Sequence, residues 1–263
     1  MRKAVSVAVS LMLSSLLAGG VATAAAPKPV PAYIAAALAD PSRGQDREAD
    51  ARRHGAELAA FAGVKPGDKV LDLIPGGGYF TRIFAKIVGL KGRVYGVWPE
   101  PYAKVAHPDP ENLTALSQQP GYGNVRVLVQ PADALAAPEP LDVVFTSQNY
   151  HDYPDKFMGS LDPAVLNNAV FKALKPGGTY IVIDHVAEAG SGLRDTDTLH
   201  RIDPEIVKRQ VQAAGFVYEG EIDALRNPAD PHTIKVFDPS IRGRTDQFVF
   251  KFKKPGGKRR AKG

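Results

Sequence analysis

Histidines lie next to chemically active neighbours at three places in the second half of the chain. The sequence reads Asn149-Tyr150-His151-Asp152, then Asp184-His185, and then His200-Arg201. Imidazole titrates near neutral pH and a carboxylate can orient it, so such segments suit general acid–base chemistry. We expect His151 to be the first candidate for a base, with Asp152 or Asp184 orienting it. His185 is the second candidate, and a structural, hydrogen-bonded role is the alternative for either histidine.

The same segments supply the other candidates for catalysis and substrate binding. Tyr150 joins the two histidines as a candidate catalytic residue. The candidates for binding a substrate are Asp152, Asp184, His200 and Arg201. The Arg201 guanidinium suits an acidic substrate group, and it equally suits a structural ion pair with Asp203 or Asp184.

A glycine-rich turn is the main binding feature of the first half. Residues 70–81 read Val-Leu-Asp-Leu-Ile-Pro-Gly-Gly-Gly-Tyr-Phe-Thr. An apolar run, glycines and then an amphipathic segment predict a strand, a tight turn and a helix. Backbone N–H groups at such a helix start can receive a carboxylate or a phosphate. The alternative is a turn whose glycines only supply positive φ angles.

The elements that must position these residues alternate between strand and helix patterns, which is typical of a parallel sheet with crossover helices. Strands are predicted at residues 70–74, 92–97, 125–130, 141–147, 179–184, 216–222 and 247–252. Helices are predicted at residues 33–39, 45–62, 80–88, 163–174 and 204–215. Ligands bind beyond the carboxyl ends of such strands, so we expect the turn and the histidine segments to face one crevice. The long connection at residues 223–246 is of a kind that often carries function.

Over roughly residues 65–254 the sequence resembles the class I S-adenosylmethionine-dependent methyltransferases. The turn at residues 72–78 is similar to that family's first motif, and Lys175-Pro176-Gly177-Gly178 is similar to its approach to strand five. The resemblance implies an α/β, Rossmann-like three-layer sandwich, with a seven-stranded, mostly parallel sheet and an antiparallel last strand. It also implies S-adenosylmethionine as the cofactor.

The resemblance assigns the methionine end of the cofactor to the glycine turn. Asp72 would arrange the cofactor's amino group or a water in the loop. Gly76 and Gly78 match the family's glycine pattern, whereas Ile74 stands where its first glycine is expected.

Around the ribose and adenine the sequence departs further from the family. Trp98 replaces the acid that accepts the ribose hydroxyls, so Glu100 is expected to reach the ribose, and Trp98 either stacks on adenine or only packs. Asp133 matches the acid near the adenine amino group, with a turn or N-cap role as the alternative. The expected cofactor-binding residues are Asp72, Gly76, Gly77, Gly78, Tyr79, Trp98, Glu100, Asp133 and Asn149.

More narrowly, several segments together resemble a group of predicted bacterial methyltransferases that carry signal peptides. They are the three histidine segments and Arg244-Thr245-Asp246-Gln247-Phe248. The expected function is methyl transfer to an unidentified acceptor, expected to be a small molecule. The alternatives are a binding protein for an adenosyl ligand that has lost the reaction and an NAD-dependent oxidoreductase. The oxidoreductase fingerprint expects a third glycine where Thr81 stands.

The two ends of the chain differ in composition from the body between them. A basic start, an apolar run and Ala22-Thr23-Ala24 predict a signal peptide at residues 1–24, and hence a secreted or periplasmic protein. An N-terminal membrane anchor is the alternative. Residues 25–64 are expected to be a linker and helices, residues 65–254 the methyltransferase domain, and residues 255–263 a solvated basic tail. Because S-adenosylmethionine is made in the cytosol and is charged, export would require a supply route.

Residues and motifs that the sequence lacks argue against cysteine-based sites, a metal site and a nucleic-acid partner. With no cysteine among 263 residues, disulfides, thiolate metal ligands and a cysteine nucleophile are excluded. We assign no metal, because His151, Asp152, Asp184 and His185 might converge but form no tight motif such as His-Glu-x-x-His. The segment after Ser147 lacks the Pro-Pro of enzymes that methylate base amino groups, so no nucleic-acid partner is expected. The oligomeric state is left open.

Overall fold

The computed structural model describes residues 29–256. The predicted signal peptide and all but two residues of the predicted basic tail lie outside this range, so both stay predictions. In chain order the helices and strands are α1 (Ala32–Ala39), η1 (Pro41–Ala49), α2 (Asp50–Arg53), α3 (Gly55–Ala62), β1 (Lys69–Leu73), α4 (Tyr79–Val88), β2 (Arg93–Pro99), α5 (Glu100–Val105), α6 (Asp109–Ser117), β3 (Val125–Gln130), β4 (Leu141–Ser147), η2 (Lys156–Met158), α7 (Pro163–Ala173), β5 (Leu174–His185), α8 (Thr196–Leu199), α9 (Pro204–Ala213), β6 (Val217–Glu221) and β7 (Gln247–Lys253).

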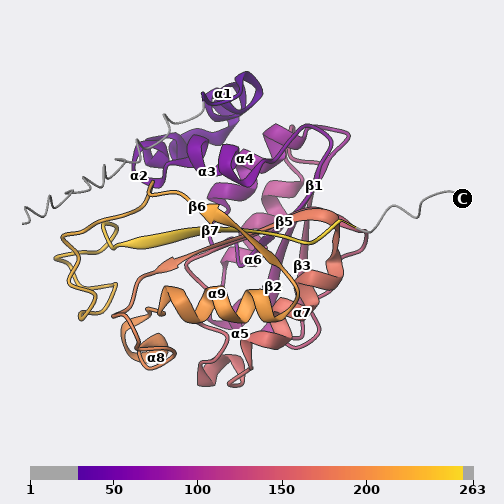
Figure 1. Ribbon diagram of the computed structural model, residues 1–263. Helices are drawn as coiled ribbons and strands as arrows, with labels where there is room; N and C mark the ends of the chain where they lie inside the picture. The colour runs from indigo at the N-terminus through magenta and orange to yellow at the C-terminus, as the bar shows by residue number, and fades with distance from the viewer. Residues whose placement is uncertain (1–28, 257–263) are drawn as a thin grey trace, which may run out of the picture.

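The strands form one seven-stranded sheet in the order β3-β2-β1-β4-β5-β7-β6. Neighbouring strands from β3 to β5 pair in parallel, and β7 lies antiparallel between β5 and β6. Helices α3 and α4 cover one face, with α1 packed on their outer side, and α7 and α9 cover the other face (Figure 1). This arrangement confirms the predicted three-layer α/β fold and its antiparallel last strand.

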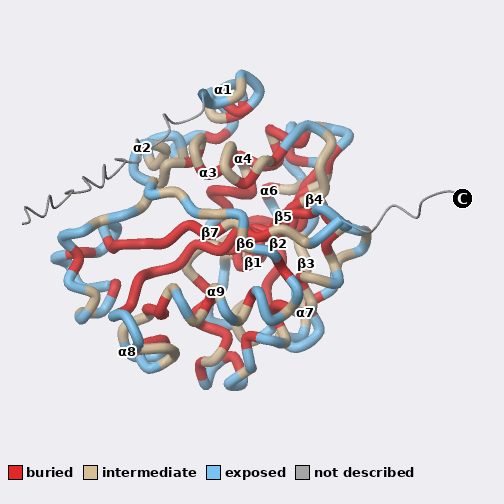
Figure 2. The backbone as a smooth tube through the Cα atoms, in the orientation of Figure 1, coloured by how far each residue is buried: buried red, intermediate tan, exposed pale blue. Residues whose placement is uncertain are grey.

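The central strands are buried on both faces, as parallel sheets covered by helices must be. In Figure 2 the buried part of the tube follows the sheet through the middle of the molecule. Strand β1 reads Lys-Val-Leu-Asp-Leu, and every residue after Lys69 is buried. One core cluster joins these strands to the flanking helices, with Phe80, Phe84 and Phe145 in mutual contact.

Several predicted boundaries were wrong for local reasons. The single helix predicted at residues 45–62 is broken at His54, whose φ is 50°. There Gly55 passes so close to the Tyr79 hydroxyl that a Cβ would clash with it. The turn predicted before strand five lies inside β5, where the pairing with β4 shifts register between Leu141 and Val143.

Two short helices, α5 and α6, were not predicted from the sequence. The predicted start of α9 is confirmed, because the Asp203 carboxylate accepts a hydrogen bond from the Glu205 N–H (2.9 Å) as an N-cap.

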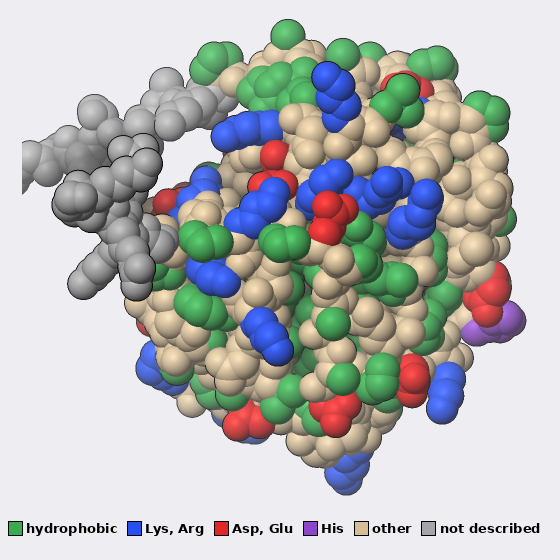
Figure 3. All heavy atoms as spheres, turned by 90° about the vertical axis from the view of Figure 1, so that its right-hand side faces the viewer, with side chains coloured by type: hydrophobic (Ala, Val, Ile, Leu, Met, Phe, Trp, Pro, Cys, Tyr) green, Lys and Arg blue, Asp and Glu red, His purple; other side chains and the backbone are tan. Residues whose placement is uncertain are grey.

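The part of the surface shown in Figure 3 carries both signs of charge. Lys and Arg side chains gather in a band there, with Asp and Glu side chains among them. Within residues 29–256, no helix is long and apolar enough to cross a bilayer.

Candidate functional site

The glycine turn joins β1 to α4 and has the conformation that its sequence predicts. Gly76 and Gly78 take positive φ angles of 54° and 83°, and Gly78 is the N-cap of α4. Gly77 is exposed. A Cβ on Gly78 would lie 2.7 Å from the Leu113 side chain. The turn therefore presents backbone rather than side chains at the carboxyl end of β1.

Ile74, which departs from the family's glycine pattern, has a left-handed backbone conformation. Its φ is 53°, a region that β-branched residues almost never adopt. Two hydrogen bonds hold it there: Ile74 N–H donates to Val97 O (2.8 Å), and Asn149 Nδ2 donates to Ile74 O (3.0 Å). Ile74 thus takes, at a cost in strain, a conformation that glycine adopts freely.

Asp72 and Tyr79 direct their side chains into the protein. The Thr81 hydroxyl donates to the Asp72 carboxylate (2.6 Å), and burial raises the pKa of Asp72 to about 7 despite that hydrogen bond. The Tyr79 hydroxyl donates to Asp50 (2.7 Å). Tyr79 was expected to bind cofactor; its buried side chain instead packs against the N-terminal helices. The expected role of Asp72, arranging the cofactor's amino group or a water in the loop, stays a prediction.

The structure at the end of β2 decides between the two expectations for Trp98, stacking on adenine and packing in the core. Its side chain is fully buried, with no hydrogen-bond partner for Nε1 among the described residues. Stacking on an adenine was therefore wrong, and the packing alternative holds. Glu100, the first residue of α5, and Asp133, after β3, are both exposed. Glu100 also lines a cavity of about 460 Å³ beside Val129 of β3.

Beyond β4 and β5, His151 is the centre of a buried polar cluster. The carboxylate of Asp184 accepts a hydrogen bond from the His151 backbone N–H (2.9 Å) and lies 2.8 Å from His151 Nδ1. On the other side of the ring, His151 Nε2 lies 3.3 Å from both His200 Nδ1 and Asp152 Oδ1. We call His151, Asp152 and His200, with Asp184 behind them, the histidine cluster. It confirms that the separate histidine segments converge.

The histidine cluster lines a cavity of about 420 Å³, the histidine cavity. Tyr102, Phe157 and Phe237 supply aromatic walls to it. Burial alone would lower the pKa of His151, but the charges of Asp184 and Asp152 and the Asp184 hydrogen bond raise it to about 9. The two buried carboxylates therefore favour a cation at this ring, and the role of His151 as a base stays a prediction.

His185 differs from His151 although Asp184 is next to it in sequence. Burial lowers its pKa to about 4, so the ring is neutral. Its Nδ1 lies 2.8 Å from the Thr245 hydroxyl oxygen. The side chain lines the histidine cavity and also a second cavity of about 200 Å³. Among the predicted catalytic residues, His185 is thus the one that is both unprotonated and accessible from two sides.

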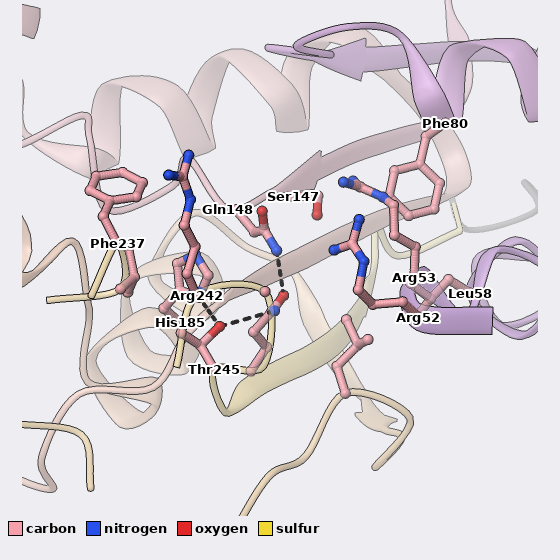
Figure 4. A pocket seen from close by; sticks show the side chains of 14 residues that line it. Arg52, Arg53, Leu58, Phe80, Ser147, Gln148, His185, Phe237, Arg242 and Thr245 are labelled. Carbon is pink, nitrogen blue, oxygen red and sulfur yellow. Dashed lines mark hydrogen bonds between the residues drawn. The ribbon is translucent and has the colours of Figure 1, made fainter. Parts of the chain in front are cut away.

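The second cavity, which we call the arginine cavity, was not predicted. It lies between the N-terminal helices and the long connection at residues 223–246, and Figure 4 shows Arg52, Arg53 and Arg242 around it. Within residues 29–256 none of these three guanidiniums forms an ion pair or donates a hydrogen bond. Gln148 and Gln247 form its floor, with Gln148 Nε2 donating to Gln247 Oε1 (2.9 Å). The sequence signal for it was the length of that connection.

Three of the predicted site residues have structural roles instead. The Tyr150 hydroxyl accepts from Asn167 Nδ2 (2.8 Å) and donates to Gln210 (3.1 Å), and Tyr150 lines neither cavity. Arg201 is buried and pairs with Asp230 (2.9 Å) rather than with Asp203 or Asp184. Because Asp230 belongs to the long connection, this ion pair anchors the connection to the body of the protein. Asn149 accepts from the Thr146 hydroxyl and, as described above, donates to the turn.

Comparison with known proteins places this site in a family context. Residues 30–217 match the family model described as protein-L-isoaspartate(D-aspartate) O-methyltransferase (PCMT). A protein-L-isoaspartate O-methyltransferase of Methanococcus aeolicus is 29% identical over 59% of this chain and 61% of its own length. A ubiquinone/menaquinone biosynthesis C-methyltransferase of Hydrogenovibrio crunogenus is 33% identical over 51% of this chain and 47% of its own length. The chain thus spans about half to three fifths of the length of these relatives.

Solved structures share the fold at low identity. An S-adenosylmethionine-dependent methyltransferase from Aquifex aeolicus is 18% identical, with a TM-score of 0.57 over 82% of this chain and 98% of its own. The [4+2]-cyclase SpnF is 17% identical, with a TM-score of 0.59 over 78% of this chain and 81% of its own. These likenesses confirm the fold.

Proposed function

Because this chain belongs to the protein-L-isoaspartate(D-aspartate) O-methyltransferase family, we propose that it transfers the methyl group of S-adenosylmethionine to a small acceptor that carries an anionic group. The family match supports the predicted class, an S-adenosylmethionine-dependent methyltransferase, and its cofactor, and the solved structures share the fold. What is proposed beyond them is this protein's own activity and its acceptor.

One observation carries the acceptor's chemistry: the guanidiniums of Arg52, Arg53 and Arg242, which form no ion pair or hydrogen bond within residues 29–256, lie around one small cavity. That of Arg53 also lies over the Tyr79 and Phe80 rings. Unpaired arginine side chains in a partly enclosed site favour a carboxylate or phosphate, which each fork can bind with two hydrogen bonds. A volume of about 200 Å³ suits one small group. This supports a small anionic acceptor rather than a neutral one.

The site's geometry supports a path from the glycine turn to that acceptor. Asn149 contacts the turn through Ile74 O, and the next residues of its loop lead to the histidine cavity. His185 and Gln148 line both cavities. An acceptor held by the arginines would place its reacting atom beside His185. Methyl transfer is an in-line displacement, so the protein mainly aligns the acceptor with the methyl group and excludes water.

Calorimetric titration of the protein with S-adenosylmethionine, S-adenosylhomocysteine and NAD tests the cofactor. We expect both adenosyl compounds to bind and NAD not to bind. If the protein, folded by circular dichroism, binds neither adenosyl compound, the methyl transfer proposed here is wrong. Binding without transfer to any fraction of a cell extract would favour the non-catalytic alternative.

Transfer of labelled methyl groups to cell-extract fractions tests the acceptor. We expect label in the small-molecule fraction, and Arg242→Gln should lower its incorporation by about 10- to 100-fold, the cost of losing a charge-assisted hydrogen bond. The affinity for S-adenosylmethionine should not change. Arg209→Gln, an exposed residue of α9 outside both cavities, is the matched control. Label confined to the protein fraction, or undiminished incorporation by Arg242→Gln, would refute an anionic small acceptor bound by the arginines.

A further inference from the structure

Two imidazoles and one carboxylate in the histidine cluster have the spacing of metal ligands. His151 Nε2 lies 3.3 Å from His200 Nδ1 and 3.3 Å from Asp152 Oδ1, and His200 Nδ1 lies 3.9 Å from Asp152 Oδ1. Ligands at about 2.0–2.1 Å from a tetrahedral metal are about 3.3–3.4 Å apart. The three atoms thus form one face of a nearly regular tetrahedron, and only the His200–Asp152 edge is somewhat long.

We propose that His151, Asp152 and His200 bind one divalent metal ion of the zinc class. Imidazole nitrogen and carboxylate oxygen are ligands that zinc accepts, and three protein ligands with an open fourth position are typical of catalytic rather than structural zinc sites. The chain has no cysteine, so the histidines are its softest metal ligands apart from thioether sulfur. This site does not depend on the proposed methyl transfer.

The surroundings of His151 fix the orientation that a ligand needs. Asp184 Oδ1 holds Nδ1 of the ring, which leaves Nε2 facing the other two ligands. A carboxylate behind a metal-binding histidine is the usual outer partner in zinc sites. Asp184 is itself fixed, because it also accepts hydrogen bonds from the backbone N–H groups of His151 and His185.

His200 is held in place from its own side of the site. It caps α8 with a φ of 54°, a strained conformation for a residue with a side chain. Its ring lies between the rings of His151 and Phe237, with centroid distances of 5.4 Å and 4.9 Å. Strain of this kind gathers at functional sites, and here it presents Nδ1 to the other two ligand atoms.

The charge of the cluster also favours a cation. Asp152 and Asp184 lie within 3.3 Å of the His151 ring, and both carboxylates are buried. Buried charges require partners. All three ligands line the histidine cavity, so the fourth coordination position opens into it. An oxygen or nitrogen donor of the acceptor, or a water, takes that position.

Sequence reasoning assigned no metal because no short motif contains these residues. His151 and Asp152 follow β4, whereas His200 follows α8, and only the fold brings them together. The predicted convergence named Asp184 and His185 instead of His200. In the structure Asp184 orients a ligand, and His185 contacts Thr245.

The test is zinc binding by the full chain, prepared without a histidine tag and stripped with a chelator. Calorimetric titration with zinc chloride should give one ion per chain. His200→Ala and Asp152→Asn should each weaken the affinity by at least about 100-fold, because loss of a ligand exceeds the 10- to 100-fold effect of an outer partner. Asp184→Asn should weaken it by about 10- to 100-fold and leave one ion bound. His107→Ala is the matched control, because that histidine is exposed and pairs only with Glu111.

Circular dichroism must show native folding for each variant, and His200→Gln provides a second variant if His200→Ala does not fold. Substitution with Co²⁺ should produce the intense visible absorption of a tetrahedral ion in the parent chain and not in the His200 variants. The proposal is wrong if the folded parent chain binds no zinc, or if the His200 and Asp152 variants bind it as tightly as the parent. Titration of the same samples with S-adenosylmethionine separates this result from failure of the proposed function.

Discussion

The glycine turn and the histidine cluster lie at the carboxyl ends of neighbouring strands, but they are built in different ways. The turn is one continuous segment whose backbone forms the binding surface, and its nearby side chains, Asp72 and Tyr79, point inward. The cluster is assembled from side chains of separate segments around a buried carboxylate, Asp184. A backbone site tolerates changes in side chains, which is consistent with an isoleucine at position 74, where the resemblance expects a glycine.

The largest expected effect is on the turn itself. Gly78→Val should weaken S-adenosylmethionine binding by at least about 100-fold, because a branched side chain at a φ of 83° is strained and would meet Leu113. Gly123→Ala is the control, since a Cβ there meets nothing within 4 Å. Calorimetry measures both. A folded Gly78→Val protein with near-normal affinity would show that the backbone of the turn is not the binding surface.

An intermediate effect is expected for Asp72, the buried acid below the turn. Its folded pKa of about 7 exceeds the ordinary aspartate pKa of 3.8, so the folded state holds this proton more tightly than the unfolded state does. Between about pH 4 and 7, rising pH should therefore cost stability, by about 1.4 kcal/mol for each pKa unit of difference. Asp72→Asn should remove this loss.

Denaturant unfolding at pH 5 and pH 8 measures this pH-dependent loss of stability. The stability of the parent chain relative to Asp72→Asn should be lower at pH 8 than at pH 5. Asp133→Asn, at an exposed acid, should give the same difference from the parent at both pH values. An equal difference at both pH values for Asp72→Asn would mean that this carboxyl is not held neutral.

The smallest expected effect concerns Ile74. Comparing two variants at this position separates the effect of backbone strain from that of side-chain packing. Ile74→Ala and Ile74→Gly both remove the buried side chain, but only glycine is relaxed at a φ of 53°. Ile74→Gly should therefore be the more stable of the two by about 1 kcal/mol, the reverse of the usual order in strands. Denaturant unfolding of the two variants measures it. If Ile74→Ala proves the more stable, the residue is not strained in solution.

The sequence predicted most of the sheet because apolar runs and turn residues are local signals. Each strand pattern marked a real strand, and the order and direction followed from the resemblance. Breaks caused by distant contacts could not be predicted, as at His54, where Gly55 must pass the Tyr79 hydroxyl. The unpredicted α5 and α6 follow β2, where Trp98 had already departed from the family pattern.

At the site, the residue types predicted the place better than the roles. His151, Asp152, His185 and His200 do gather beside two cavities. However, the protonation of each imidazole depends on which neighbours are buried with it, and sequence does not give this. Arg201 and Arg53 have the same side chain, but only the fold shows that the first pairs with Asp230 and that the second lies over the Tyr79 and Phe80 rings beside a cavity.

The position of β7 has a consequence for how the chain acquires its structure during synthesis. Residues 247–253 occupy the place between β5 and β6, and they pair with both. A growing chain that has not yet released these residues from the ribosome leaves one edge of β5 open, and β6 has no strand beside it. Unpaired strand edges are templates for association with other chains. Until β7 emerges, the open edge of β5 can therefore pair with a strand of another chain.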